Sequence, residues 1–364
     1  MSLPDTMLTM DSLLITVDGA EHEATVENIK RLLDSSTRFW LDLPGLDQDA
    51  GVTLLRDTFG FHPLAIEDAE HFGQRPKLDS YDSFALLVAY GATDDGQLVE
   101  VHCFYTDQYL VTVHHDPCPD LRHLAERLRR PIPRPDHVML LYRVLDTLVD
   151  GFFPVLARLD DQIDELEDEI LQRPTEQQLG RLFDLKRSLI ALRKVVTPQR
   201  DMFAMLLSES DALPGMTPEA ERYFRDLYDH LIRISDLVDS YRDLLTGAMD
   251  THLSTVSNRL NVVMKQLTII ATIFLPLSFL TGFFGQNFAW MITRITSLQV
   301  FLVLGVGLQI LTVVALLVLF QRRGWLSGDG TVASASPATR QTLPPDRRWC
   351  LLHLVRDSPG SSGG

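Results

Sequence analysis

The stretch LTIIATIFLPLSFLTGFFGQNFAW, residues 267–290, combines a run of apolar side chains with an abrupt polar turn. Its apolar part, 267–284, approaches the roughly 20 residues that a helix needs to cross a bilayer. A second apolar run, LQVFLVLGVGLQILTVVALLVLF, follows at 298–320. Placing Gln286 and Asn287 between two such runs would cost free energy unless these amides have a role. The sequence therefore predicts two transmembrane helices joined by a short polar external loop, 285–297.

Basic residues flank the two apolar runs. Arg259 and Lys265 precede the first run, and Arg322 and Arg323 follow the second, whereas the loop holds only Arg294. Since basic residues concentrate on the cytoplasmic side of a membrane, we expect a multi-pass protein of the cell membrane with both termini in the cytoplasm. The first residues lack a signal-peptide pattern. The basic end and tail, 321–364, have a composition typical of disorder.

The charge of the chain limits its partners. There are 49 acidic and 33 basic residues, for a net charge of −16, and most of the acid precedes residue 251. Such a surface attracts cations and repels nucleic acid. The sequence contains no phosphate-binding loop, nucleophile elbow or HExxH motif, so we expect neither an enzyme nor an ATP-driven pump, and no covalently bound cofactor. The three cysteines, Cys103, Cys118 and Cys350, suggest no disulfide framework.

Residues 1–135 predict a cytoplasmic α/β domain that ends at the proline-rich RRPIPRP, 129–135. β-Branched and aromatic runs closed by turn residues indicate strands, and apolar residues at helical spacing lie between some of them. The predicted strands are 13–19, 37–45, 83–92, 98–107 and 108–115, and the predicted helices are 49–60 and 120–130.

From residue 136 the pattern becomes helical. Apolar residues from Leu145 to Ile170 recur every three or four positions, which predicts one long helix up to the break QRPT, 172–175. Its acidic face is typical of a solvated helix surface, and the next helix has a basic face. We therefore expect an antiparallel hairpin over 136–212. A stalk helix is predicted over 213–266. The stretch from Glu219 to Leu275 contains no proline and as one helix would be roughly 85 Å long. Such a helix must pack against others, most simply copies of itself.

One face of the first apolar run differs from the rest. Small, flexible or polar residues recur there at helical spacing, which favours either close helix packing or a pore lining. Oxygen-bearing residues below the run (Asp250, Asn261) and above it (Gln286, Asn287) favour the pore, because an ion path needs oxygen groups at its mouths and tolerates an apolar constriction between them. The stripe consists of Asn261, Met264, Leu267, Ala271, Leu275, Ser278 and Gly282.

Three segments resemble the CorA family of divalent-cation transporters: SNRLNVVMKQLTIIATIFLPLSFLTGFFGQNF (257–288), HPLAIEDAEHFGQRPK (62–77) and RRGWL (322–326). The resemblance implies an α+β fold in which a cytoplasmic α/β domain is followed by long helices and two C-terminal transmembrane helices. It implies a homopentameric funnel. It also implies passive Mg²⁺ influx, with Co²⁺ and Ni²⁺ as further ions, driven by the membrane potential and inhibited by cytoplasmic Mg²⁺.

The resemblance also assigns residues. Asn287 would bind the hydrated ion, with Gly285 and Gln286 completing the signature. Asp68 and Asp226 would hold a regulatory divalent ion between neighbouring subunits. The implied pore lining is Ser278, Leu275, Leu267, Asn261 and Asp250, with the two leucines as constrictions.

Two departures from the family pattern leave the identity of the transported ion open. Gln286 stands where the family usually has Met, and the outer loop lacks an acidic Pro-Glu-Leu element and carries Arg294. The alternatives are a Zn²⁺ transporter of the same architecture, with or without proton coupling, and a membrane-anchored scaffold or sensor that conducts nothing.

Overall fold

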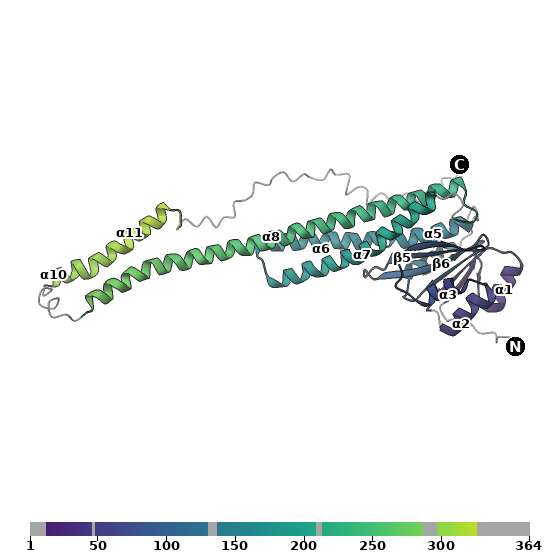
Figure 1. The fold of residues 1–364 in the computed structure, drawn as a ribbon, viewed down its shortest axis with the longest axis horizontal. Helices are drawn as coiled ribbons and strands as arrows, with labels where there is room; N and C mark the ends of the chain where they lie inside the picture. The colour runs from purple at the N-terminus through teal and green to yellow at the C-terminus, as the bar shows by residue number, and fades with distance from the viewer. Residues whose placement is uncertain (1–11, 46–47, 130–136, 209–212, 287–296, 326–364) are drawn as a thin grey trace, which may run out of the picture. The chain divides into compact units, whose positions relative to one another are not determined.

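The computed structural model describes residues 12–45, 48–129, 137–208, 213–286 and 297–325 (Figure 1). The chain divides into two compact units, Met1–Val256 and Ser257–Gly364, and each is described by itself. Asn287, most of the predicted external loop and the predicted tail lie outside the described residues.

A seven-stranded mixed sheet forms the centre of the first unit (Figure 1). Its strand order is β2-β1-β3-β7-β6-β5-β4; β3 and β7 are parallel, and the other neighbours are antiparallel. Five strands confirm the predicted runs, because β-branched and aromatic residues suit a buried pleated surface. The short, polar β2 and β4 were not predicted. The bounds are β1 Leu13–Thr16, β2 Glu21–His22, β3 Phe39–Pro44, β4 Lys77–Ser80, β5 Ala85–Ala92, β6 Leu98–Tyr105 and β7 Tyr109–His114.

The sheet separates two apolar cores. Leu14 and Leu86 enter one core, whereas their chain neighbours Ile15 and Leu87 enter the other, as the two-residue period of a strand requires. The core that contains Leu14 and Leu86 includes residues of α1, α2, a π-helical segment and α3. The core that contains Ile15 and Leu87 includes residues of α4 and the later helices. These elements are α1 Val26–Asp34, α2 Gln48–Thr53, the π segment Leu54–Thr58, α3 Pro63–Glu70 and α4 Pro119–Leu128.

The helix predicted up to residue 172 is two helices, α5 His137–Asp150 and α6 Phe152–Gln172. The expectation of one continuous helix is therefore corrected. Gly151 lies between them, and a Cβ atom there would stand 2.5 Å from the carbonyl oxygen of Ala92 on β5. Contact with the sheet thus determines the joint, which the apolar periodicity alone could not indicate.

The helices α6 and α7 form a hairpin. The helix α6 ends at Gln172, residues 173–175 are not helical, and α7 spans Glu176–Ser208. Arg181 on α7 contacts Glu169 at 2.9 Å and Glu165 at 3.2 Å on α6. These pairs join the acidic face of one helix to the basic face of the other, as expected of an antiparallel pair with complementary charges.

The helix α8 spans Pro218–Phe284 without interruption and includes Pro276. In the first unit its buried side chains recur at helical spacing from Ala220 to His252, so one face of α8 packs on the core there.

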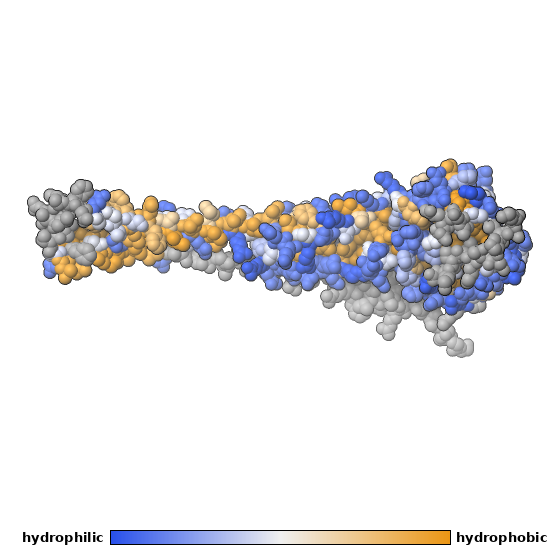
Figure 2. Space-filling view, turned by 90° about the horizontal axis from the view of Figure 1, so that it is seen from below, coloured by the Kyte–Doolittle hydropathy of each residue, from blue (hydrophilic) through white to orange (hydrophobic). Residues whose placement is uncertain are grey.

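The second unit contains the rest of α8, α10 (Leu298–Val300), a π-helical segment (Phe301–Gly307) and α11 (Leu308–Arg322). The part of the chain that the structure describes has two helices long and apolar enough to cross a membrane, and neither apolar window is buried. Figure 2 shows apolar residues over the surface at the left, where α8 and α11 lie in Figure 1. Such a large exposed apolar surface is typical of contact with lipid or with other chains.

Candidate functional site

The stripe predicted to line a pore is exposed along its whole length. Met264 and Leu267 are each 59% exposed and Leu275 is 77% exposed. Asn261, Ala271, Ser278 and Gly282 are exposed as well, as is Asp250 below them on α8. The single chain therefore leaves this face uncovered.

The opposite face of the same span is partly covered. Ile269, Ile273, Pro276, Leu280 and Phe284, which lie about half a turn away from the stripe, are half-buried. Two hydrogen bonds join α8 to α11 and to the residues after it. Lys265 Nζ donates to the Gly324 carbonyl at 3.5 Å, and Gln309 Nε2 donates at 3.0 Å to Oγ1 of Thr281, an exposed residue between the two faces. The chain's own second apolar helix thus packs away from the stripe.

The signature turn begins at the end of α8. The Gly285 amide donates to the Thr281 carbonyl at 2.9 Å, and the Gln286 amide donates to the Phe283 carbonyl at 3.3 Å. Gly285 and Gln286 are exposed. A Cβ atom at position 285 would lie 3.0 Å from the Thr281 carbonyl oxygen, which is a tight contact, so a side chain here would require a small shift of the backbone.

Asp68, one of the two predicted regulatory carboxylates, lies on α3 and is neutralised within its own chain. Lys77 Nζ lies 2.6 Å from Asp68 Oδ2 and 2.9 Å from Asp79 Oδ2. Gln74 Nε2 donates to Asp68 Oδ1 at 2.9 Å. Burial raises the pKa of Asp68, but the hydrogen bonds from Lys77 and Gln74 outweigh it and hold the pKa below its usual value.

A buried carboxylate holds the loop that carries Gln74. Glu100 on β6 accepts hydrogen bonds from the backbone amides of Gly73 and Gln74 and from the Tyr90 hydroxyl, and it pairs with His102 at 2.7 Å. These bonds lock the loop against the sheet. The orientation of Gln74 toward Asp68 is therefore determined by the core.

Asp226, the other predicted carboxylate, lies on α8 beside a different cluster. Its side chain is 62% exposed, and its Oδ2 lies 3.9 Å from His230 Nε2. The structure does not bring Asp68 and Asp226 together within one chain: Asp68 pairs with Lys77, whereas Asp226 borders the cluster around His230. The predicted contact is between neighbouring chains, so it stays a prediction.

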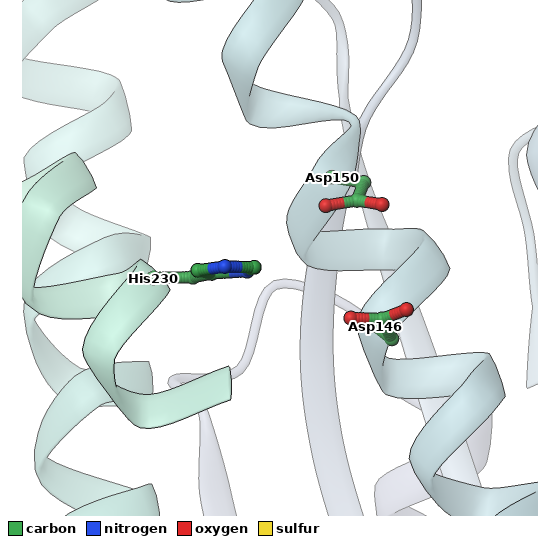
Figure 3. A group of neighbouring side chains, drawn as sticks. All are labelled: Asp146, Asp150 and His230. Carbon is green, nitrogen blue, oxygen red and sulfur yellow. The ribbon is translucent and has the colours of Figure 1, made fainter. Parts of the chain in front are cut away.

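The cluster next to Asp226 consists of Asp146, Asp150 and His230 (Figure 3). The two aspartates lie one turn apart on α5, and the His230 ring on α8 points toward the gap between them. One ligand atom from each residue lies within 4.8 Å of the other two, a spacing that could hold a metal ion. The Nδ1 atom of His230 is buried and has no hydrogen-bond partner among the described residues.

The electrostatics of this cluster differ from those of Asp68. Burial, with the charge of Asp150 next, raises the pKa of Asp146 to about 6. Burial also raises the pKa of Asp150, although the charges of His230 and Arg127 oppose this. Ionising both groups is costly because like charges disfavour one another in a partly desolvated site. A divalent cation would remove that cost.

The sheet positions α5 and therefore its two aspartates. A Cβ atom on Gly91 of β5 would lie 3.2 Å from the Cα of Leu148, so the helix and the strand are in close contact midway between Asp146 and Asp150. The close approach of Gly151 to Ala92 fixes the end of α5. Because the backbone is held on both sides, the site is preorganised.

The sequence prediction does not include Asp146, Asp150 or His230. One signal could have found them: Asp146 and Asp150, like Asp226 and His230, are spaced i,i+4, which puts both members of each pair on one helix face. The pairs come together only because α5 packs beside α8.

Comparison with known proteins agrees with this architecture. Residues 35–322 match the model of the family described as CorA-like Mg²⁺ transporter protein. The chain belongs to this family. It is 39% identical over 280 residues to the cobalt/magnesium transport protein CorA of Thermotoga maritima, covering 73% of this chain and 78% of the relative.

Two further comparisons bear on fold and ion. The complete structure of the CorA magnesium transporter from Methanocaldococcus jannaschii has a TM-score of 0.73 at 22% identity and covers 88% of this chain and 100% of its own, which shows a shared fold. The zinc transport protein ZntB of Yersinia enterocolitica is 29% identical over 191 residues, 52% of this chain and 58% of its own length. The CorA-like architecture predicted from the sequence is thus confirmed.

Proposed function

We propose that this chain is a CorA-type transporter that admits Mg²⁺ passively into the cytoplasm, with Co²⁺ and Ni²⁺ as further substrates. A membrane potential of roughly 100 mV gives about 4.6 kcal/mol for a double charge, so no chemical energy source is required. Family membership and the two apolar helices support this proposal.

The observation that carries the proposal is the uncovered stripe on α8, from Asn261 to Gly282. If copies of α8 surround an axis in a homopentamer, the stripe can face that axis while α11 packs behind it. Leu267 and Leu275 would form apolar constrictions. The amide of Asn287 would meet a hydrated ion at the outer mouth, since Mg²⁺ gives up water reluctantly and prefers oxygen ligands.

Cytoplasmic divalent ions would inhibit transport at two places. One is the cluster of Asp146, Asp150 and His230; the other is Asp68, meeting Asp226 of a neighbouring subunit. An ion bound at either place offsets the repulsion between carboxylates and favours a closed bundle of stalk helices. When the ion leaves, the carboxylates repel one another and the constriction can fill with water. Inhibition then reflects a higher affinity of the ion for the closed state.

The donors of the Asp146 cluster fit divalent ions of more than one type. Carboxylate oxygens suit Mg²⁺, whereas an imidazole suits Co²⁺, Ni²⁺ and Zn²⁺. The buried Nδ1 of His230, which has no hydrogen-bond partner in the part of the chain that the structure describes, offers a nitrogen ligand that Mg²⁺ uses poorly. We therefore expect His230→Gln to weaken inhibition by Co²⁺ more than inhibition by Mg²⁺.

Flux through the purified protein in proteoliposomes tests the transport proposal. We expect Mg²⁺ uptake that depends on membrane potential, is blocked by hexaamminecobalt(III) and is lost in Asn287→Ala. Uptake of Zn²⁺ that depends on a pH gradient would instead support a zinc transporter. No divalent flux through an intact oligomer would support a non-conducting scaffold.

Cysteine substitution tests which face of α8 lines the pore. A charged thiol reagent added from outside should block flux through Ser278→Cys, which lies on the exposed stripe. The matched variant Leu280→Cys, on the half-buried face, should be insensitive. Equal block of both, or of Leu280→Cys alone, would contradict the assignment of the pore face.

A further inference from the structure

A polar contact connects the two apolar helices of the second unit. Gln309 Nε2 on α11 donates to Thr281 Oγ1 on α8 at 3.0 Å. Gln309 is half-buried and is followed by Ile310 and Leu311. An amide in such surroundings is costly unless it is paired, so polar residues in membrane helices usually have a structural or functional role.

Thr281 also supports the signature turn. Its hydroxyl accepts the hydrogen bond from Gln309, while its carbonyl accepts the Gly285 amide at 2.9 Å. The residue after Gly285 is Gln286, whose amide bonds to the Phe283 carbonyl. One residue therefore joins α11 to the last turn of α8, the point where the chain leaves the helix for the mouth.

The helix that supplies Gln309 has an unusual segment just before it. Residues Phe301–Gly307 are π-helical and include Gly305 and Gly307, and α11 starts at Leu308. A π turn contains more residues than an α turn, so it rotates the residues that follow around the helix axis. Such segments often occur at functional sites. Gln309 lies two residues after this segment.

We propose that Gln309 is a positioning residue for the outer mouth: through Thr281 it fixes the last turn of α8, from which Gly285 and Gln286 extend. The inference rests on the proposed transport function. It assigns to the second helix, which does not line the proposed pore, a part in how the mouth receives the hydrated ion.

Substitutions at both ends of the bond test this role. Thr281→Val removes the hydroxyl and keeps the shape, whereas Thr281→Ser keeps the hydroxyl. Gln309→Leu removes the amide. Thr272→Val is the matched control, because the Thr272 hydroxyl bonds to the Thr268 carbonyl at 2.7 Å within α8. The measurements are Mg²⁺ uptake against external Mg²⁺ concentration and block by hexaamminecobalt(III), in proteoliposomes with the full chain.

We expect Thr281→Val and Gln309→Leu each to raise the half-saturating external Mg²⁺ concentration about threefold, the size typical of a hydrogen bond between membrane helices. The maximal rate should be unchanged, and block by hexaamminecobalt(III) should weaken in parallel. The double variant should match the single variants, since both remove one interaction. Thr281→Ser and Thr272→Val should behave like the parent chain.

Several outcomes would overturn the inference. These are unchanged half-saturation in the single variants, additive effects in the double variant, an equal effect in Thr272→Val, or a lower maximal rate with unchanged half-saturation. Oligomer assembly is checked by size-exclusion chromatography, and Gln309→Met replaces Gln309→Leu if the latter does not assemble. Absence of Mg²⁺ flux in the parent chain would instead reject the proposed function.

Discussion

Asp68 and Asp146 are both partly buried carboxylates of the first unit, yet their surroundings have opposite effects. Lys77 and Gln74 neutralise Asp68 within its own chain, and its pKa is lowered. Asp146 has another aspartate next to it, and burial with that charge raises its pKa to about 6. Asp68 is thus already paired with the ammonium group of Lys77, whereas the carboxylates of the Asp146 cluster would be stabilised by an added positive charge.

This difference indicates which site gains more from a divalent ion. At the Asp146 cluster, an arriving cation offsets repulsion and desolvation that the folded chain has already incurred. At Asp68, the cation must first displace the ammonium group of Lys77. The first site should therefore respond more strongly to cytoplasmic ions than the second.

The largest effect is expected from Asp146→Asn combined with Asp150→Asn. Removing both charges should raise the cytoplasmic Mg²⁺ concentration for half-inhibition at least about tenfold, equivalent to about 1.4 kcal/mol. Inhibition is measured as Mg²⁺ efflux or uptake with internal Mg²⁺ varied. The control is Asp161→Asn with Asp164→Asn, which removes two exposed charges from α6. If the control shifts inhibition equally, general charge rather than this cluster is responsible.

A smaller effect of opposite sign is expected from Lys77→Met. Without the ammonium group, Asp68 becomes available to a divalent ion, and half-inhibition should occur at a lower Mg²⁺ concentration. The change should reach at most about fivefold, since a partly exposed ion pair contributes about 0.2–1 kcal/mol. Arg75→Gln removes the same charge from an exposed residue two positions away and should have little effect. Unchanged inhibition in Lys77→Met would show that the pair with Asp68 does not compete with the ion.

The smallest expected effect is on the pH dependence of folding stability in the metal-free protein. Since the pKa of Asp146 rises from 3.8 to about 6 on folding, its protonated form stabilises the folded state below pH 3.8. This contribution is lost as the pH rises through about 6.

Asp146→Asn mimics the protonated form at every pH. In EDTA, its melting temperature should match that of the parent chain at low pH and exceed it at neutral pH, and saturating Mg²⁺ should stabilise only the parent through this group. A melting-temperature difference that does not depend on pH would contradict the shifted pKa.

Several elements followed from local properties of the sequence. Five strands were identified because β-branched and aromatic residues mark a pleated buried surface, and the hairpin was identified from its apolar period and the break at 172–175. Short or polar elements such as β4 lacked these signals. The joint at Gly151 was missed because the apolar spacing continues across it, whereas the break depends on contact with Ala92.

The proposed pore face and the acidic cluster show the same difference between what neighbouring residues determine and what packing determines. The sequence by itself determined the two apolar spans, the long helix and the stripe from Asn261 to Gly282, since length, hydropathy and helical spacing are properties of neighbouring residues. Only the tertiary structure decided that Asp146 and Asp150 face His230, that Lys77 neutralises Asp68 and that Gln309 contacts Thr281. Each of these pairs depends on how separate elements pack, and that packing results from the whole core and from no local pattern.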